Sequence, residues 1–144
     1  MNSMLKSLLV LVLLAAAGFA QASDFAETKK KAEQGDADAQ SNLGKMYANG
    51  DGVPKDSAEA VKWFRKSAEQ GYAAAQHNLG VMYYNGTGVI KNPAQAHAWW
   101  SIAGSRGFKE AKKNLVSLEK EMTAEQKAEA MKLARELFAR LRKK

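Results

Sequence analysis

The sequence has 144 residues, a formal net charge of +7, no cysteine and only two histidines. A chain of this length suits a single domain, and the absence of cysteine excludes disulfide bonds, a lipid-modified cysteine and zinc sites built on thiolates. The sequence also lacks the HExxH and GxSxG motifs and a phosphate-binding loop, so the common hydrolase and nucleotide-binding signatures are missing.

Residues 1–22 have the construction of a signal peptide. Lys6 provides a positive charge, residues 8–20 form an unbroken apolar run, and Ala20-Gln21-Ala22 matches the A-x-A cleavage pattern. The alternative is an uncleaved membrane anchor, but the thirteen apolar residues fall short of the ~20 that span a bilayer. We therefore expect a mature chain that begins at Ser23, is periplasmic or secreted, and has no transmembrane segment.

A repeat of 36 residues fills most of the mature chain. Residues 32–56 and 68–92 agree at 17 of 25 positions, and a third, partial copy follows. The third copy has Val116 where the first two have Gly44 and Gly80, and it lacks the glycine-containing loop. A fixed period of this length is typical of solenoid proteins, and the third copy is their incomplete terminal unit.

Each repeat predicts two helices. In the first unit, residues 37–48 and 57–70 carry small and bulky apolar side chains at helical spacing. Three pairs of residues have the spacing of a capping box at the start of a helix: Asp56 with Glu59, Asn92 with Gln95, and Thr123 with Gln126. With two helical segments in each period, the sequence predicts an all-α fold.

The loop between the two helices, LGKMYANGDGVPKD from Leu43, has the glycines and acids of an ion-binding or phosphate-binding loop. Its second copy, LGVMYYNGTGVIKN from Leu79, has Thr87 in place of Asp51, and a calcium loop depends on such acids. Glycines also permit the positive φ angles that end one helix and let the chain reverse into the next. We therefore interpret the loop as a structural joint.

These features resemble the Sel-one-like repeat (SLR), a relative of the tetratricopeptide repeat. In the first unit the matching residues are Ala37, Ala39, Leu43, Gly44, Tyr47, Gly50, Gly52, Val53, Asp56, Ala60, Trp63, Ala68 and Gly71, and the second unit departs at Asn92, where the family usually has Asp. The resemblance implies a right-handed α-solenoid of antiparallel helix pairs that acts as a scaffold for protein partners, often in bacterial envelopes. The expected organisation is a signal peptide at 1–22, a solenoid at 23–122 with units at about 32–67, 68–103 and 104–122, and a capping helix at 123–144.

The first helices of the units share a stripe of residues that differ between copies. In tetratricopeptide-like solenoids the first helices line the concave surface, so by resemblance the stripe forms a groove for a protein or peptide partner. Its centre is aromatic and apolar and its ends are charged, as a binding surface requires. The alternative is that these positions vary because they are solvated. The predicted groove residues are Asp38, Ser41, Lys45, Ala74, His77, Val81, Tyr84, Glu110 and Lys113.

Aromatic residues of the second helices are candidates for a sugar-stacking platform: Trp63, Phe64, Trp99 and Trp100. Trp63 and Trp99 recur at the repeat period, which favours core packing. Two histidines without cysteine leave too few strong ligands for zinc and no evident base for a nucleophile. We therefore predict no enzyme, no cofactor and no metal, with a cryptic hydrolase as a third alternative.

The C-terminal segment, residues 123–144, predicts a basic amphipathic helix. Residues 109–144 hold eleven basic and six acidic side chains. Apolar side chains recur at helical spacing and are expected to cover the third unit and close the solenoid. These are Met131, Ala134, Leu137, Phe138 and Leu141.

Two functions follow from these features. The leading hypothesis is an exported, non-enzymatic adaptor that binds a protein segment and serves envelope regulation or assembly. The alternative is a protein that binds an anionic envelope polymer, peptidoglycan or exopolysaccharide, through its basic C-terminal helix. Nucleic acid is disfavoured as a partner because the basic segment lacks interleaved aromatic residues.

Overall fold

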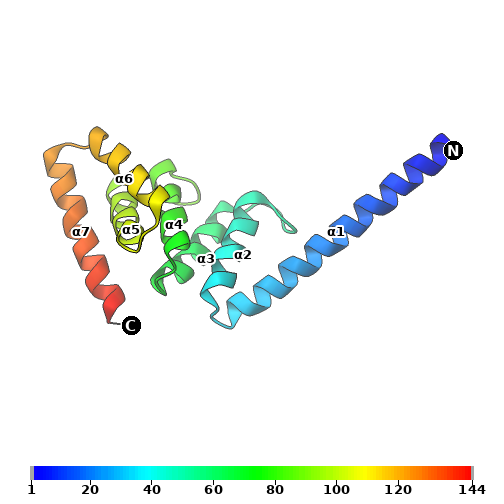
Figure 1. Cartoon of the computed structure of the whole chain (residues 1–144), viewed down its shortest axis with the longest axis horizontal. Coiled ribbons are helices and arrows are strands. Elements are labelled where there is room, and N and C mark those ends of the chain that lie inside the picture. Colours follow the sequence, from blue (N-terminus) through cyan, green and yellow to red (C-terminus); the bar gives the residue numbers. More distant parts are fainter. Residues whose placement is uncertain (1, 144) are drawn as a thin grey trace.

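The structure is a series of α-helices packed side by side, with the first helix extending away from the rest (Figure 1). The computed structural model describes residues 2–143. Their elements are α1 (Ser3–Glu33), α2 (Ala37–Asn49), α3 (Ser57–Glu69), α4 (Ala73–Asn85), α5 (Pro93–Ser105), α6 (Lys109–Glu121) and α7 (Ala124–Arg142), with no strand among these residues. The predicted all-α solenoid is confirmed.

Each complete repeat unit is a pair of helices, and successive pairs stack. α2 packs against α3 and α4 against α5 within the units, while α3 packs against α4 and α5 against α6 between them. The bounds predicted for the first unit, 37–48 and 57–70, lie within one residue of those of α2 and α3.

The apolar faces predicted from helical spacing form the core. Leu43 and Leu79 are completely buried, and the rings of Trp63 and Trp99 are buried as well. Burying one such side chain stabilises the fold by about 1.5–3 kcal/mol. The recurring tryptophans therefore belong to the core and not to a sugar-stacking platform.

Two glycines let the helices of a unit approach closely. A Cβ atom at Gly44 would lie 2.7 Å from the ring of Phe64, and one at Gly80 would collide with the indole of Trp100. Real side chains do not approach this closely, so only glycine lets the ring of the second helix rest on the backbone of the first.

The loops between paired helices are the expected structural joints. Gly50 and Gly86 end α2 and α4 with φ angles of 77° and 68°, a conformation that other residues resist. The side chains of Asp56 and Asn92 then accept a hydrogen bond from the main chain at the start of α3 and α5. Both residues therefore act as helix caps, but the predicted capping boxes are incomplete, because the backbone N–H groups of Asp56 and Asn92 donate to the carbonyls of Tyr47 and Tyr83.

The end of α1 occupies the place of a second helix that precedes the first unit. The Gln40 side chain donates to the carbonyl of Ala32 in α1 at 3.1 Å, and the Gln76 side chain donates to that of Ala68 in α3 at 3.0 Å. These two buried contacts lie one repeat apart. α1 therefore supports α2 in the way that α3 supports α4.

The loop glycines extend this equivalence toward the start of α1. A Cβ atom at Gly52 would lie 2.5 Å from the carbonyl oxygen of Gln21, and one at Gly88 would meet the carbonyl of Ser57, again one repeat later. Since Ser57 is the first residue of α3, the part of α1 that corresponds to a second helix begins at Gln21.

The predicted signal peptide lies in the first part of α1, whose helix continues without a break through Ala22 and Ser23. The leucines and valines of this part are exposed. The most apolar 18-residue window of α1 has a mean hydropathy of 2.1, so the helix is long and apolar enough to cross a membrane, as signal sequences also are. The thirteen-residue apolar run is therefore compatible with an anchor as well as with a signal peptide. Among residues 2–143 no other helix meets these criteria.

The C-terminal helix α7 covers a surface other than the expected one. Thr123 and Gln126 form both hydrogen bonds of a capping box, as predicted. Leu137 is buried, and Ala134 and Leu141 are half-buried, against a core cluster that includes α5. α7 packs along α5 and has almost no contact with α6. It therefore closes the outer side of α5, whereas the sequence predicted that it covers the third unit.

Candidate functional site

The predicted groove residues lie on α2, α4 and α6, the first helices of the three units, but they differ in exposure. Asp38, Lys45, Glu110 and Lys113 are exposed; Ala74, His77, Val81 and Tyr84 are half-buried; and Ser41 is fully buried. We call the eight accessible residues the first-helix face. Its centre is on α4 and its charged ends are on α2 and α6, which is the predicted order.

Ser41 does not belong to this face. Its side chain is 0% exposed, and its hydroxyl has no hydrogen-bond partner among the described residues. A serine hydroxyl ends close to the helix backbone, so neighbouring side chains enclose it, whereas the side chain of Lys45 on the next turn extends into solvent. The prediction of Ser41 as a groove residue is therefore wrong.

A row of aromatic rings runs across the centre of the first-helix face. Tyr84 lies against Trp100 with ring centroids 5.6 Å apart, and His77 lies between Trp100 and Phe108 at 6.4 and 5.0 Å. The Trp100 indole also donates a hydrogen bond to the His77 carbonyl at 3.1 Å. Because Trp100 is anchored in this way, it holds Tyr84 and His77 in fixed positions.

A cleft of about 150 Å³ opens beside this row, between α4 and α6. Val81 and Tyr84 of the predicted face lie on one wall, and Ser117 of α6 lies on the other. Trp100 and Leu118 contribute apolar surface. The cleft is large enough for one apolar side chain of a partner but not for a drug-sized ligand.

Two tyrosines at the edges of the face donate to carboxylates. The Tyr72 hydroxyl donates to Asp38 at 2.5 Å, and this hydrogen bond raises the pKa of the phenol. The Tyr84 hydroxyl donates to Glu121 at 3.3 Å, and the negative charge of Glu121 raises the pKa of the Tyr84 phenol. Both phenols therefore stay protonated at neutral pH and connect neighbouring helices.

His77 is held neutral in the middle of the face. Its Nδ1 atom is buried without a hydrogen-bond partner in the described part of the chain. Burial lowers the pKa of His77 below the ordinary 6.5, while the nearby Glu110 carboxylate acts in the opposite direction but less strongly. A neutral imidazole between aromatic rings keeps the centre of the face uncharged.

Acidification should therefore destabilise the protein through His77. The unfolded chain protonates this histidine first as the pH falls, so the stability it contributes is complete above the ordinary pKa of 6.5 and is lost between that value and the lower folded pKa. Urea unfolding measures this effect at about pH 7.5 and about pH 5. Between these two pH values the free energy of unfolding should fall less for His77→Phe than for the wild type. Equal losses in the two proteins would contradict this account.

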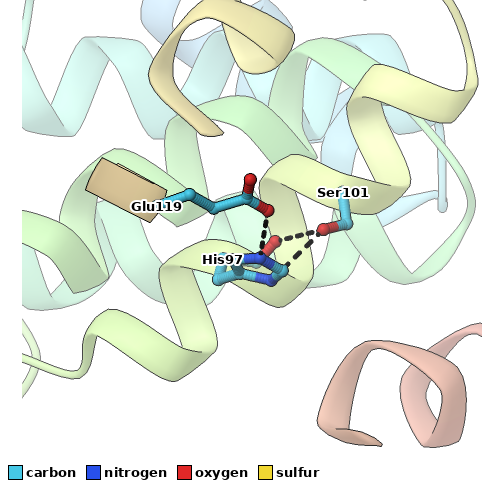
Figure 2. A network of polar contacts seen from close by, with 3 residues as sticks. All are labelled: His97, Ser101 and Glu119. Atoms are coloured by element: carbon cyan, nitrogen blue, oxygen red, sulfur yellow. Dashed lines mark hydrogen bonds and ion pairs between the residues drawn. The ribbon is translucent and has the colours of Figure 1, made fainter. Parts of the chain in front are cut away.

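A second polar cluster, which the sequence did not predict, joins α5 to α6 (Figure 2). The His97 Nε2 and Glu119 Oε1 atoms lie 2.9 Å apart, and the Ser101 hydroxyl lies 3.3 Å from His97 Nδ1. The same hydroxyl donates to the main-chain carbonyl of His97 at 2.8 Å, and the His97 side chain is 3% exposed. The hydroxyl proton of Ser101 is therefore directed to the backbone, and the imidazole of His97 is not accessible to solvent.

This cluster is structural, although it contains the residue types of a hydrolase. A nucleophilic serine also needs backbone N–H groups free to stabilise an oxyanion, and Ser101 lies inside α5, where these groups bond within the helix. One repeat earlier, Arg65 donates to Tyr83 at 2.7 Å and joins α3 to α4. The His97–Glu119 pair replaces that contact between the second and third units.

No metal centre is evident in residues 2–143, where no three His, Asp or Glu side chains gather. A hollow of about 490 Å³ lies at the C-terminal ends of α3 and α5 and contains none of the predicted groove residues. Lys66 and Arg106 line it, and cations at such positions are accounted for by the negative ends of the helix dipoles.

Comparisons with known proteins agree with the repeat. A family model described as the Sel1 repeat matches residues 37–72 and 73–108, which together make half of the chain. Both matches begin at the first residue of a first helix, Ala37 and Ala73. No curated protein matches the sequence.

The solved structures that are similar to this chain include the following two. A protective antigen present in uropathogenic Escherichia coli strains, with an SLR fold, has a TM-score of 0.78 and 37% sequence identity over 81% of this chain and 25% of its own. A Sel1 repeat protein from Oxalobacter formigenes has a TM-score of 0.63 and 39% identity over 65% of this chain and 39% of its own. This chain thus spans well under two thirds of the length of either protein.

Proposed function

The chain belongs to the Sel1 repeat family, whose members generally act as scaffolds for protein–protein interaction, and from that premise we propose that it is an exported, non-enzymatic adaptor of the bacterial envelope. In this proposal a segment of a partner protein binds across the first-helix face. The adaptor serves the regulation or the assembly of envelope components.

The observation that carries this proposal is the cleft between α4 and α6. It combines a shallow apolar hollow with fixed aromatic rings, and exposed charges stand at both ends of the face: Asp38 and Lys45 on α2, and Glu110 and Lys113 on α6. An apolar centre that holds an anchor side chain, surrounded by a polar rim, is the usual construction of a protein-binding surface.

The cleft can be blocked without disturbing the core, which gives a direct test of groove binding. Ser117 is exposed on α6 and lines the cleft, so Ser117→Trp should fill it and reduce the capture of a partner from an envelope extract by about tenfold or more. Thr87→Trp, a change at an exposed loop residue, is the matched control and should capture as the wild type does. If Ser117→Trp captures as much partner as the wild type does, the partner does not bind in this cleft.

The same experiment separates the adaptor from the polymer-binding alternative. Binding to peptidoglycan or exopolysaccharide through surface lysines and arginines should weaken steeply with added salt and should not respond to Ser117→Trp. Binding in the apolar cleft should respond to Ser117→Trp and weaken much less with salt.

Export is tested by the N-terminus of the mature protein. The positive charge at Lys6, the apolar first part of α1 and the Ala20-Gln21-Ala22 pattern predict cleavage before Ser23. N-terminal sequencing of protein recovered from the periplasm of the source bacterium should therefore begin with Ser23. Protein that keeps its leader and sediments with the inner membrane would show that α1 is an anchor.

A further inference from the structure

The third repeat unit has a first helix but no second helix. α2 pairs with α3 and α4 pairs with α5, whereas α7 leaves α6 and packs along α5. In the first two units the second helix rests on the first at a glycine, Gly44 or Gly80. The corresponding residue of α6 is Val116, and its side chain is 55% exposed. The side of α6 that a second helix would cover is therefore open.

An apolar groove lies next to this open side, between α5 and α7. It has a volume of about 380 Å³ and is lined by Ser101, Ile102 and Ser105 of α5 and by Arg135, Phe138 and Arg142 of α7, together with Ala134 and Ala139. Ser101 contacts His97, which bonds to Glu119 of α6. Ser101, on the α5 wall of the groove, therefore lies next to the contact between α5 and α6.

We call this groove, together with the open side of α6, the third-unit slot, and three of the four large apolar side chains exposed outside α1 in residues 2–143 lie on α6 or α7. Outside α1, the large apolar side chains that are exposed in residues 2–143 are Ile90, Val116, Met131 and Phe138. Val116 lies on the open side of α6, and Phe138 lines the groove between α5 and α7. Met131 lies two turns before Phe138 on the same face of α7. Apolar groups concentrated in one hollow mark a docking surface, whereas single exposed ones do not.

The charge of the slot defines its occupant. Arg135 and Arg142 line the groove, and neither forms an ion pair with a carboxylate among residues 2–143. Residues 109–144 also carry an excess of basic over acidic side chains. A partner that inserts apolar side chains into the groove between α5 and α7 therefore meets two unpaired guanidinium groups, which carboxylates match in charge and geometry.

A second copy of this chain fits the slot less well. The helix of a second copy that could act as a second helix is the end of α1. There Glu27 and Thr28 occupy the positions that correspond to Trp63 and Phe64. Glu27 is already paired with Lys31 on its own helix at 2.8 Å. Burying these charges against Val116 and Phe138 is unfavourable, so the polar end of α1 is suited to face solvent.

We propose that the third-unit slot binds an amphipathic α-helix of a partner protein, with apolar side chains on one face and Asp or Glu residues beside them. This helix takes the place of the missing second helix of the third unit. The site is separate from the cleft between α4 and α6, so the proposal does not depend on the proposed function.

The test uses a helix-stapled peptide of about 14 residues, because shorter isolated helices are marginal in water. One face of the peptide carries leucines and the flanking positions carry glutamates; a matched peptide has lysines in place of the glutamates. Fluorescence anisotropy with the full mature chain should show that the acidic peptide binds at least about tenfold more tightly than the basic one. Equal affinity for the two peptides would overturn the proposal.

Variants of the slot should change this binding in a defined way. Phe138→Ala should lower the affinity for the acidic peptide by about tenfold. The double variant Arg135→Glu, Arg142→Glu should bind the basic peptide more tightly than the acidic one. Ile90→Ala and Lys132→Glu, at exposed positions that do not line the slot, are the matched controls and should bind as the wild type does. A Kd for the acidic peptide that is unchanged by the double charge reversal would also overturn the proposal.

A lipid surface is the rival partner for a basic helix with exposed apolar side chains. Sedimentation with vesicles of equal parts phosphatidylglycerol and phosphatidylcholine tests it with the same variants. No sedimentation of the wild-type protein, together with binding of the acidic peptide, supports the slot. The opposite result would overturn the proposal and assign this face to the membrane. In that case the wild-type protein sediments with the vesicles, Phe138→Ala does not, and the wild-type protein does not bind the acidic peptide.

Discussion

Removal of residues 123–144 should lower the melting temperature by about 15 °C or more and cause the protein to aggregate. α7 covers the outer side of α5, where Ala98 and Ile102 are 0% and 2% exposed. The deletion exposes these side chains and also removes the buried Leu137. At about 1.5–3 kcal/mol for each large side chain, the loss is a large part of the 5–15 kcal/mol that stabilises a typical domain. Calorimetry and size-exclusion chromatography measure both effects.

The repeat provides a matched control for this deletion. Ala98 and Ile102 correspond to Lys62 and Lys66 of α3, which are exposed. Adding Ala98→Lys and Ile102→Lys to the truncated protein gives α5 the polar outer side of α3, so the truncated protein should become monomeric again. If the simple deletion is monomeric and melts as the full chain does, α7 is an independent arm and not a cover.

The second large effect is expected for Gly80→Val, which should destabilise the protein by about 3 kcal/mol or more. A side chain at this position collides with the indole of Trp100. The indole then has to move away from the His77 carbonyl, to which it donates a hydrogen bond at 3.1 Å. Urea unfolding monitored by circular dichroism measures the change in free energy.

A double-mutant cycle shows whether the glycine and the indole act as a pair. Trp100→Ala alone should also destabilise the protein because it leaves a large cavity. In the Trp100→Ala background, however, Gly80→Val should cost far less than in the wild type, since the valine enters the space that the indole has left. Strictly additive changes would mean that Gly80 is required for a reason other than the approach of Trp100.

The helices of the two complete repeat units could be predicted from the sequence, because the apolar spacing and the helix-capping residues indicate the same helices. The spacing of Leu43, Trp63 and their copies defines the buried faces, and Asp56 and Asn92 predict the starts of α3 and α5. Each of these signals acts within one turn or one loop and appears twice. Secondary structure and pairing could therefore be predicted almost to the residue.

The position of α7 was missed because it depends on a difference between the copies. Its own pattern shows an amphipathic helix but not the surface that the helix covers. That surface is indicated by α5, where Ala98 and Ile102 replace the lysines of α3. A comparison of the outer sides of the second helices would have predicted that α7 packs on α5.

The residues of the candidate site were chosen from differences between the copies, and one of them is not accessible. Variation between the copies identified the face that contains Tyr84 and His77, but it did not distinguish exposed positions from enclosed ones. Ser41 varies as Lys45 does, yet it is buried, because burial depends on neighbouring units. The His97–Glu119 pair was missed for a similar reason: the two residues lie on different helices and replace unlike residues, Val61 and Tyr83.

The equivalence between the end of α1 and the second helices affects how a gene of this kind changes length during evolution. α2 receives from α1 the contacts that α4 receives from α3: a glutamine side chain bonded to an alanine carbonyl, and a loop glycine against the start of the preceding helix. Loss of residues 37–72 would join Asp36 to Ala73 and place α4 on α1 with an interface of the same type. Gain of one copy would do the reverse. A single duplication or deletion in phase with the repeat therefore preserves the contacts at both ends of the array and changes the extent of the first-helix face.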